Sequence, residues 1–148
     1  MDNPVLAGIH HVKFPVTDLA HSRAWYEELF GLVPVLEFPD AEGVVRGVSY
    51  APVGVGVTIS LRENPAAARG IAGFDPVSFA IADRAAAEAW VARLDELAIA
   101  HSPVIQATLG WLVVFHDPDG TEIHLYSLEE HGIDSGDDPR AGRRVAVG

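Results

Sequence analysis

Hydrophobic and polar positions alternate at the start of residues 10–32, "HHVKFPVTDLAHSRAWYEELFGL", and the alternation then changes to a helical spacing. Valine or phenylalanine at every second position predicts a strand over about 10–16 with one apolar face. Asp18 follows, where its side chain can accept a free backbone N–H in the first turn of a helix, and Gly31 suits a left-handed helix end. The segment therefore predicts a strand followed by a capped helix.

A second copy of this pattern lies further along the chain. When the sequence is shifted by 65 positions, residues 7–32 align with 72–97 without a gap and with ten identities, among them Asp18 with Asp83. About one or two identities would be expected by chance. An internal repeat of this length predicts a chain built from two equivalent modules.

Three short runs with strand character follow each predicted helix, so the module is strand-helix-strand-strand-strand (βαβββ) and the fold class is α+β. Turn sequences separate the runs; in "DPDG", for example, Asp117, Pro118 and Gly120 hold favoured positions of a type I turn. The predicted strands lie near 32–38, 44–50 and 55–62 in the first module and near 102–107, 111–116 and 121–127 in the second.

The same pattern gives a domain organisation. Residues 1–130 are predicted to form a single domain from two modules, about 7–63 and 72–128. Segment 64–73 is predicted to link the modules, and residues 131–148, which are poor in apolar side chains, are predicted to be a loose tail.

The composition of the chain excludes some kinds of binding partner and some kinds of metal site. The net charge is −11, from 10 basic and 21 acidic residues, which argues against nucleic acid and against an anionic membrane surface. A cationic ligand is compatible with this charge, although solubility is the simpler explanation. The absence of cysteine excludes disulfides and thiolate metal sites. No apolar run approaches the roughly 20 residues of a membrane helix, so a cytoplasmic location is expected.

The doubled module, which opens with the segment quoted above and closes with "FHDPDGTEIHLYS" (115–127), resembles the vicinal oxygen chelate superfamily. This superfamily contains glyoxalases, bleomycin-resistance proteins and extradiol dioxygenases, and the resemblance covers roughly residues 7–128. It implies that each four-stranded mixed sheet curves around a cavity. It also implies a small-molecule ligand and a homodimer. The activity has to come from the site itself, because one fold serves many functions.

The resemblance further implies metal ligands on the first and last strand of each module. Placed by the repeat, these four positions hold His11, Ser60, Pro76 and His124. Imidazole is a common ligand, so His11 and His124 are the candidate metal ligands, and Zn, Ni, Mn or Fe are the candidate ions. Proline cannot ligate through its side chain and serine is a weak ligand, so a carboxylate such as Glu122 would have to complete the set.

Two functions remain open, and the incomplete ligand set favours the first. The first is a metal-free protein that binds a small molecule in the cavity. The second is an enzyme, a glyoxalase-like lyase or isomerase or a dioxygenase, in which the metal polarises substrate oxygens and Glu122 moves a proton. The candidate substrate-binding residues, chosen as hydrogen-bonding or aromatic side chains on strands, are Ser60, Arg46, Tyr50, Trp111 and Tyr126.

Overall fold

The computed structural model describes residues 3–52, 54, 56–134, 136 and 138–146. These residues form two compact units, and each unit is described here by itself. The first contains Met1–Phe74 together with Asp117–Thr121, and the second contains Asp75–His116 together with Glu122–Gly148. Each unit holds one four-stranded sheet. None of the helices in the described part of the chain has the length and hydrophobicity needed to cross a membrane.

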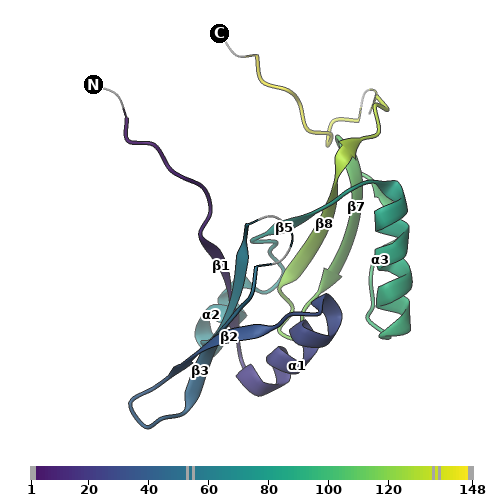
Figure 1. Cartoon of the computed structure of the whole chain (residues 1–148). Coiled ribbons are helices and arrows are strands. Elements are labelled where there is room, and N and C mark those ends of the chain that lie inside the picture. The colour runs from purple at the N-terminus through teal and green to yellow at the C-terminus, as the bar shows by residue number, and fades with distance from the viewer. Residues whose placement is uncertain (1–2, 53, 55, 135, 137, 147–148) are drawn as a thin grey trace. The chain divides into compact units, whose positions relative to one another are not determined.

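The first unit is a βαβββ module followed by a short helix (Figure 1). Its sheet has the strand order β1-β4-β3-β2, in which β1 and β4 are parallel and the other pairs are antiparallel. The elements are β1 (His11–Val16), α1 (Leu19–Phe30), β2 (Pro34–Pro39), β3 (Val45–Tyr50), β4 (Thr58–Glu63) and α2 (Pro65–Ile71).

The second unit repeats this topology, with strand order β5-β8-β7-β6 and β5 parallel to β8. In Figure 1, α3 runs along β7 and β8. Its elements are β5 (Ser78–Ile81), α3 (Arg84–Glu96), β6 (Ile105–Gln106), β7 (Gly110–His116) and β8 (Glu122–Glu130). The predicted α+β fold with a doubled βαβββ module and two mixed sheets is therefore confirmed.

The structure adds one element that the sequence pattern did not predict. Segment 64–73, predicted as a link, contains helix α2, whose first turn is capped by Asn64 accepting a hydrogen bond from the backbone N–H of Ala67 (3.0 Å). Pro65 occupies the first helical position, where its missing N–H costs nothing. Ala68 is fully buried, so contacts with the rest of the unit stabilise a helix too short to be stable alone.

The predicted helix caps are confirmed in both modules. Asp18 accepts the backbone N–H of His21 (3.1 Å), and Asp83 accepts that of Ala86 (2.9 Å). Gly31 ends α1 with φ of 65°, a left-handed conformation that a side chain would strain.

Strand register shows which residues of the two modules are equivalent. In the first sheet Lys13 lies opposite Ser60, and in the second Ser78 lies opposite His124. The 65-residue shift that aligns the first strands takes Lys13 to Ser78. Ser60 and His124 are therefore equivalent positions on the fourth strand of each module, as the sequence repeat predicts.

Each sheet has a buried helix face and an open face, defined here as the face opposite its helix. Side chains of a strand alternate between the two faces. Apolar side chains at every second position form the helix-face core, and the polar positions between them lie on the open face. The helix-face residues with at most 1% exposure include Phe14, Val16, Ile59 and Leu61 in the first unit and Val113, Phe115, Ile123 and Leu125 in the second.

The chain beyond β8 forms no helix or strand in its described residues, 131–134, 136 and 138–146. It nevertheless makes contacts within the second unit. The backbone N–H of Gly142 donates to the hydroxyl of Thr108 (3.2 Å), and Arg144 pairs with Glu130 (3.4 Å).

The turn at residues 117–121 is held in the first unit by a buried hydrogen bond. The hydroxyl of Tyr26 donates to Oδ2 of Asp117 at 2.7 Å, and both residues are almost fully buried. The other oxygen of Asp117 accepts the backbone N–H groups of Asp119 and Thr121. Burial raises the pKa of the Asp117 carboxyl, while these three hydrogen bonds act to lower it.

We expect Tyr26→Phe to lower the free energy of unfolding by about 1.5–3 kcal/mol, because a buried carboxylate loses a hydrogen-bond donor. Urea unfolding at neutral pH measures this loss. The loss should shrink as pH falls through the raised pKa of Asp117, because a protonated carboxyl accepts more weakly than a carboxylate. In an Asp117→Asn background the same substitution should cost less at neutral pH, and an equal cost in both backgrounds would contradict this account.

Candidate functional site

The open face of the first sheet carries a cavity of about 550 Å³. Three strands supply its polar lining, and β2 supplies an apolar wall made of Val35, Leu36 and Phe38. The polar lining includes His11 and Lys13 on β1, Ser49 on β3, and Thr58, Ser60 and Arg62 on β4. Strand alternation places Phe14 and Val16 on the helix face of β1 and His11 and Lys13 on its open face. His11 and Lys13 therefore line the same cavity.

Two hydroxyls form the floor of the cavity. The Oγ atoms of Ser49 and Ser60 lie 2.6 Å apart, and Ser60 is 4% exposed. Ser60, a predicted substrate-binding residue, therefore lines the cavity with its hydroxyl shared with a neighbouring strand. One hydroxyl of the pair donates to the other, and both oxygen atoms can still accept a hydrogen bond from a ligand.

His11, a predicted metal ligand, lies at the start of β1 and lines the same cavity. Its Nδ1 is 3.0 Å from Nδ1 of His10, and the two rings meet edge to face with centroids 5.2 Å apart. Both histidines are exposed. The expected partner His124 belongs to the second unit. The pairing of His11 with His124 across one shared cavity stays a prediction.

Two predicted substrate-binding residues of β3 make polar side-chain contacts with other residues of the unit. Arg46 pairs with Asp40 (2.9 Å) and with Glu63, and the hydroxyl of Tyr50 donates to Glu27 of α1 (3.1 Å). The helix face of β3 carries residues 46, 48 and 50, because residues 47 and 49 face the cavity. Tyr50 is buried and also lines the cavity, so its predicted role in binding a ligand stays a prediction. Arg46 does not line the cavity, and the prediction that it binds substrate is corrected on this geometry.

Trp111 of β7 also lies on a helix face. The guanidinium of Arg84, at the start of α3, lies 4.5 Å from the centre of the indole ring. The ring of His131 meets it from another direction, with centroids 5.4 Å apart. Trp111 therefore covers the end of the helix layer and does not share a face with His124, which corrects its predicted role as a ligand-binding residue.

Tyr126 shares the open face of β8 with Glu122 and His124, as strand alternation predicts. Its hydroxyl accepts the backbone N–H groups of Leu109 (3.0 Å) and Gly110 (3.2 Å). The hydroxyl therefore holds the turn before β7, and it keeps one O–H donor in addition to the ring for a ligand.

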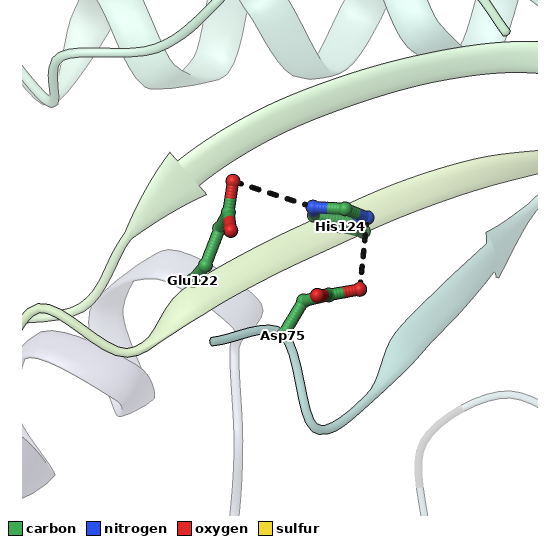
Figure 2. Close-up of side chains that lie close together, drawn as sticks. All are labelled: Asp75, Glu122 and His124. Atoms are coloured by element: carbon green, nitrogen blue, oxygen red, sulfur yellow. Dashed lines mark ion pairs between the residues drawn. The ribbon is translucent and has the colours of Figure 1, made fainter. Parts of the chain in front are cut away.

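On the open face of the second sheet, His124 lies between two carboxylates (Figure 2). Its Nδ1 is 3.4 Å from Oδ2 of Asp75, and its Nε2 is 3.5 Å from Oε1 of Glu122. One ligand atom from each of the three residues lies within 4.8 Å of the others, and all three residues are half-buried. The Nε2 atom is buried and makes no hydrogen bond to any residue that the structure describes.

This donor set fits a divalent cation. Two carboxylates and one imidazole are ligands that suit Mn, Fe and Zn. A carboxylate beside Nδ1 is the usual device that orients an imidazole whose other nitrogen binds a metal. The buried, unpartnered Nε2 beside Glu122 is therefore the atom best placed to bind a cation, with Asp75 orienting the ring from the other side.

Asp75 is a candidate functional residue that the sequence pattern did not single out. It precedes Pro76, the position equivalent to His11, and the 65-residue shift aligns Asp75 with His10. That shift was the available signal, because it places a ligand-type side chain at the head of the first strand in both modules. The carboxylate reaches His124 because the register sets Ser78 opposite His124, with Asp75 just before β5.

The family model for the Glyoxalase/Bleomycin resistance protein/Dioxygenase superfamily matches residues 8–125. The chain belongs to this superfamily. No curated protein matches the chain. Among solved structures, it resembles TnmS3, an antibiotic binding protein from Streptomyces sp. CB03234, with 22% identity and a TM-score of 0.67 over 84% of this chain and 98% of that one.

Two further solved structures share the glyoxalase-superfamily fold. The lactoylglutathione lyase from Agrobacterium tumefaciens is 21% identical, with a TM-score of 0.67 over 86% of this chain and 98% of that chain. The fosfomycin resistance protein FosX from Listeria monocytogenes, complexed with Mn(II) and sulfate, is 16% identical, with a TM-score of 0.60 over 83% of this chain and 91% of that chain. At these identities the likeness shows the fold alone.

Arg46 stabilises the first unit of this glyoxalase-superfamily protein through its two ion pairs, and two arginine variants test this role. Arg46→Ala should lower the midpoint of urea unfolding, because Asp40 and Glu63 lose their cation. The Arg46 hydrogen bond lowers the pKa of Asp40, so the defect should be present at neutral pH and disappear as pH falls through that lowered pKa. Arg62→Ala, which removes a cavity-lining arginine, should leave the midpoint unchanged. The reverse order of effects would contradict this assignment.

Proposed function

We propose that the protein binds a small organic molecule in the cavity on the open face of its first sheet. The observation that carries this proposal is the cavity itself, about 550 Å³ with an apolar wall and a hydroxyl-bearing floor. Ligand sites of proteins have this size and this combination of apolar walls with a few placed polar groups.

The apolar wall is unusually open for strand residues of this size. Val35, Leu36 and Phe38 are 56%, 57% and 43% exposed. A contiguous apolar patch that is exposed to water often marks a ligand-binding or interaction site. A ligand with an apolar body would cover these side chains and remove them from water.

The comparisons support the same class of function. The superfamily model names bleomycin-resistance proteins, and one solved relative is described as an antibiotic binding protein. The homodimer expected from the family resemblance stays a prediction, which sedimentation of the purified protein would test.

The proposed cavity can be tested with N-phenylnaphthylamine, an uncharged dye whose fluorescence rises in apolar sites. We expect Phe38→Ala to weaken dye binding by about tenfold, since removing a buried aromatic contact costs roughly 1.4 kcal/mol or more. Phe74→Ala removes a second exposed phenylalanine of the same unit, 62% exposed and outside the cavity, and should leave the affinity unchanged.

A variant that fills the cavity gives an independent check. Thr58 lines the cavity and is only half-buried, so Thr58→Trp occupies space without entering the core. We expect this variant to keep its unfolding midpoint and lose dye binding. Equal dye binding by Phe38→Ala, Phe74→Ala and Thr58→Trp would end the proposal.

A second function is favoured by one specific observation, the buried and unpartnered Nε2 of His124 between Asp75 and Glu122. We propose that this site takes a divalent cation, held by His124 and Glu122 with Asp75 orienting the ring. A bound cation would act as a Lewis acid on neighbouring substrate oxygens. The Mn(II) complex of the fosfomycin resistance protein supports metal binding as a property of this fold.

Calorimetric titration with MnCl₂ and with ZnCl₂ tests the cation site. His124→Ala and Glu122→Gln should abolish binding, and Asp75→Asn should weaken it by about 10–100-fold, the usual cost of losing an orienting group. His101→Ala is the control, since His101 pairs with Asp95 outside the cluster. Binding that survives in His124→Ala, or is lost equally in His101→Ala, would contradict the site. His11→Ala tests the predicted contribution of His11 in the same titration.

A further inference from the structure

We infer that the ligand of the first-sheet cavity is an anion with an apolar body, held by Lys13 and Arg62. This inference rests on the proposed function and names the chemical class of its ligand. It concerns the charge inside the cavity, which is opposite to that of the whole chain.

The cavity is locally basic in a strongly acidic protein. Lys13 and Arg62 both line it, together with His10 and His11. Among the described residues that line it, none is acidic, although the chain has 21 acidic and only 10 basic residues. The acidic composition, which is compatible with a cationic ligand, is therefore a poor guide to this cavity.

The two cations lack the carboxylate partners that several other basic residues of the chain have. Arg23 and Arg46 each contact two carboxylates, and Arg84 pairs with Glu88. Lys13 and Arg62 form no ion pair with any residue that the structure describes. Their charge is therefore available to a ligand.

The strand register brings the two cations together. On β1 and β4, Lys13 lies opposite Ser60, and Arg62 is two residues further along the same face. Lys13 and Arg62 are thus diagonal neighbours across Ser60. Both side chains therefore extend from the same face of the sheet into one cavity, where both charges attract an anion.

Gly47 of β3 sets the position of Arg62. A Cβ at residue 47 would lie 3.3 Å from one guanidinium nitrogen and 3.4 Å from Cδ of Arg62. The arginine side chain therefore lies across bare backbone on the floor of the cavity. A guanidinium in the cavity can donate to a carboxylate, sulfonate or phosphonate group, and the hydroxyls of Ser49 and Ser60 line the same cavity.

The apolar wall on β2 indicates that the ligand also has an apolar part. Leu36 and Phe38 line the same cavity as the two cations. A ligand that satisfies both carries an anionic group at one end and an apolar, preferably flat, body at the other. Carboxylate, sulfonate and phosphonate share the required chemistry.

Two dyes that differ in one sulfonate test this inference. Anilinonaphthalene sulfonate is an anionic counterpart of the uncharged N-phenylnaphthylamine, and both are measured by fluorescence titration of the full chain. We expect the sulfonate to bind about tenfold more tightly, which is roughly 1.4 kcal/mol for one charge-assisted contact. Added sodium chloride should weaken binding of the sulfonate and leave binding of the uncharged dye unchanged.

The variants locate the effect. Arg62→Gln and Lys13→Gln should each reduce sulfonate affinity toward that of the uncharged dye, without changing the affinity of the uncharged dye. Gly47→Ala should do the same by displacing Arg62. Arg69→Gln is the matched control. It removes the same positive charge, and Arg69 lies on α2 outside the cavity.

The outcomes separate the two proposals. If both dyes bind equally, or if Arg69→Gln weakens sulfonate binding as much as Arg62→Gln does, the anionic ligand is wrong while the cavity stands. If neither dye responds to Phe38→Ala or Thr58→Trp, the cavity itself is not the binding site and both proposals fail. A circular dichroism spectrum of each variant confirms that it is folded.

Discussion

The structure depends on one constraint: helices pack against one face of each sheet, and that face must be apolar. Strand side chains alternate, so every strand must place its apolar residues on the helix face and is free to place polar residues on the other. Phe14 and Val16 enter the core for this reason, and His11 and Lys13 are left on the open face. The chemistry of the molecule is therefore concentrated on the open faces.

The two modules use equivalent positions for different chemistry. Position 60 of the first module is a serine in a hydroxyl pair, and its equivalent in the second module is His124 between two carboxylates. The first open face has cations and hydroxyls beside an apolar wall, whereas the second has an imidazole and acidic groups. The two modules share one topology and register and differ on the open faces, which the core does not constrain.

The turn at 117–121 shows how a short segment becomes part of a unit distant in sequence. Tyr26 and Asp117 are 91 residues apart, and their buried hydrogen bond joins α1 to this turn. A buried carboxylate needs several donors, and Asp117 has one side-chain and two backbone donors. The type I turn predicted from "DPDG" is thus also a packing element, a role that no local pattern could indicate.

The repeat, the helix caps at Asp18 and Asp83, and the face on which His11 and His124 lie could be predicted from the sequence, because they follow from local periodicity and spacing. Contacts between distant residues were needed to show that Arg46, Tyr50 and Trp111 turn to the helix faces and that Asp75 joins His124 and Glu122. Which face of β3 or β7 meets a helix depends on neighbouring strands and on contacts between residues distant in sequence. Amphipathic side chains such as arginine, tyrosine and tryptophan suit either face, so their direction is set by these partners and not by the residue type.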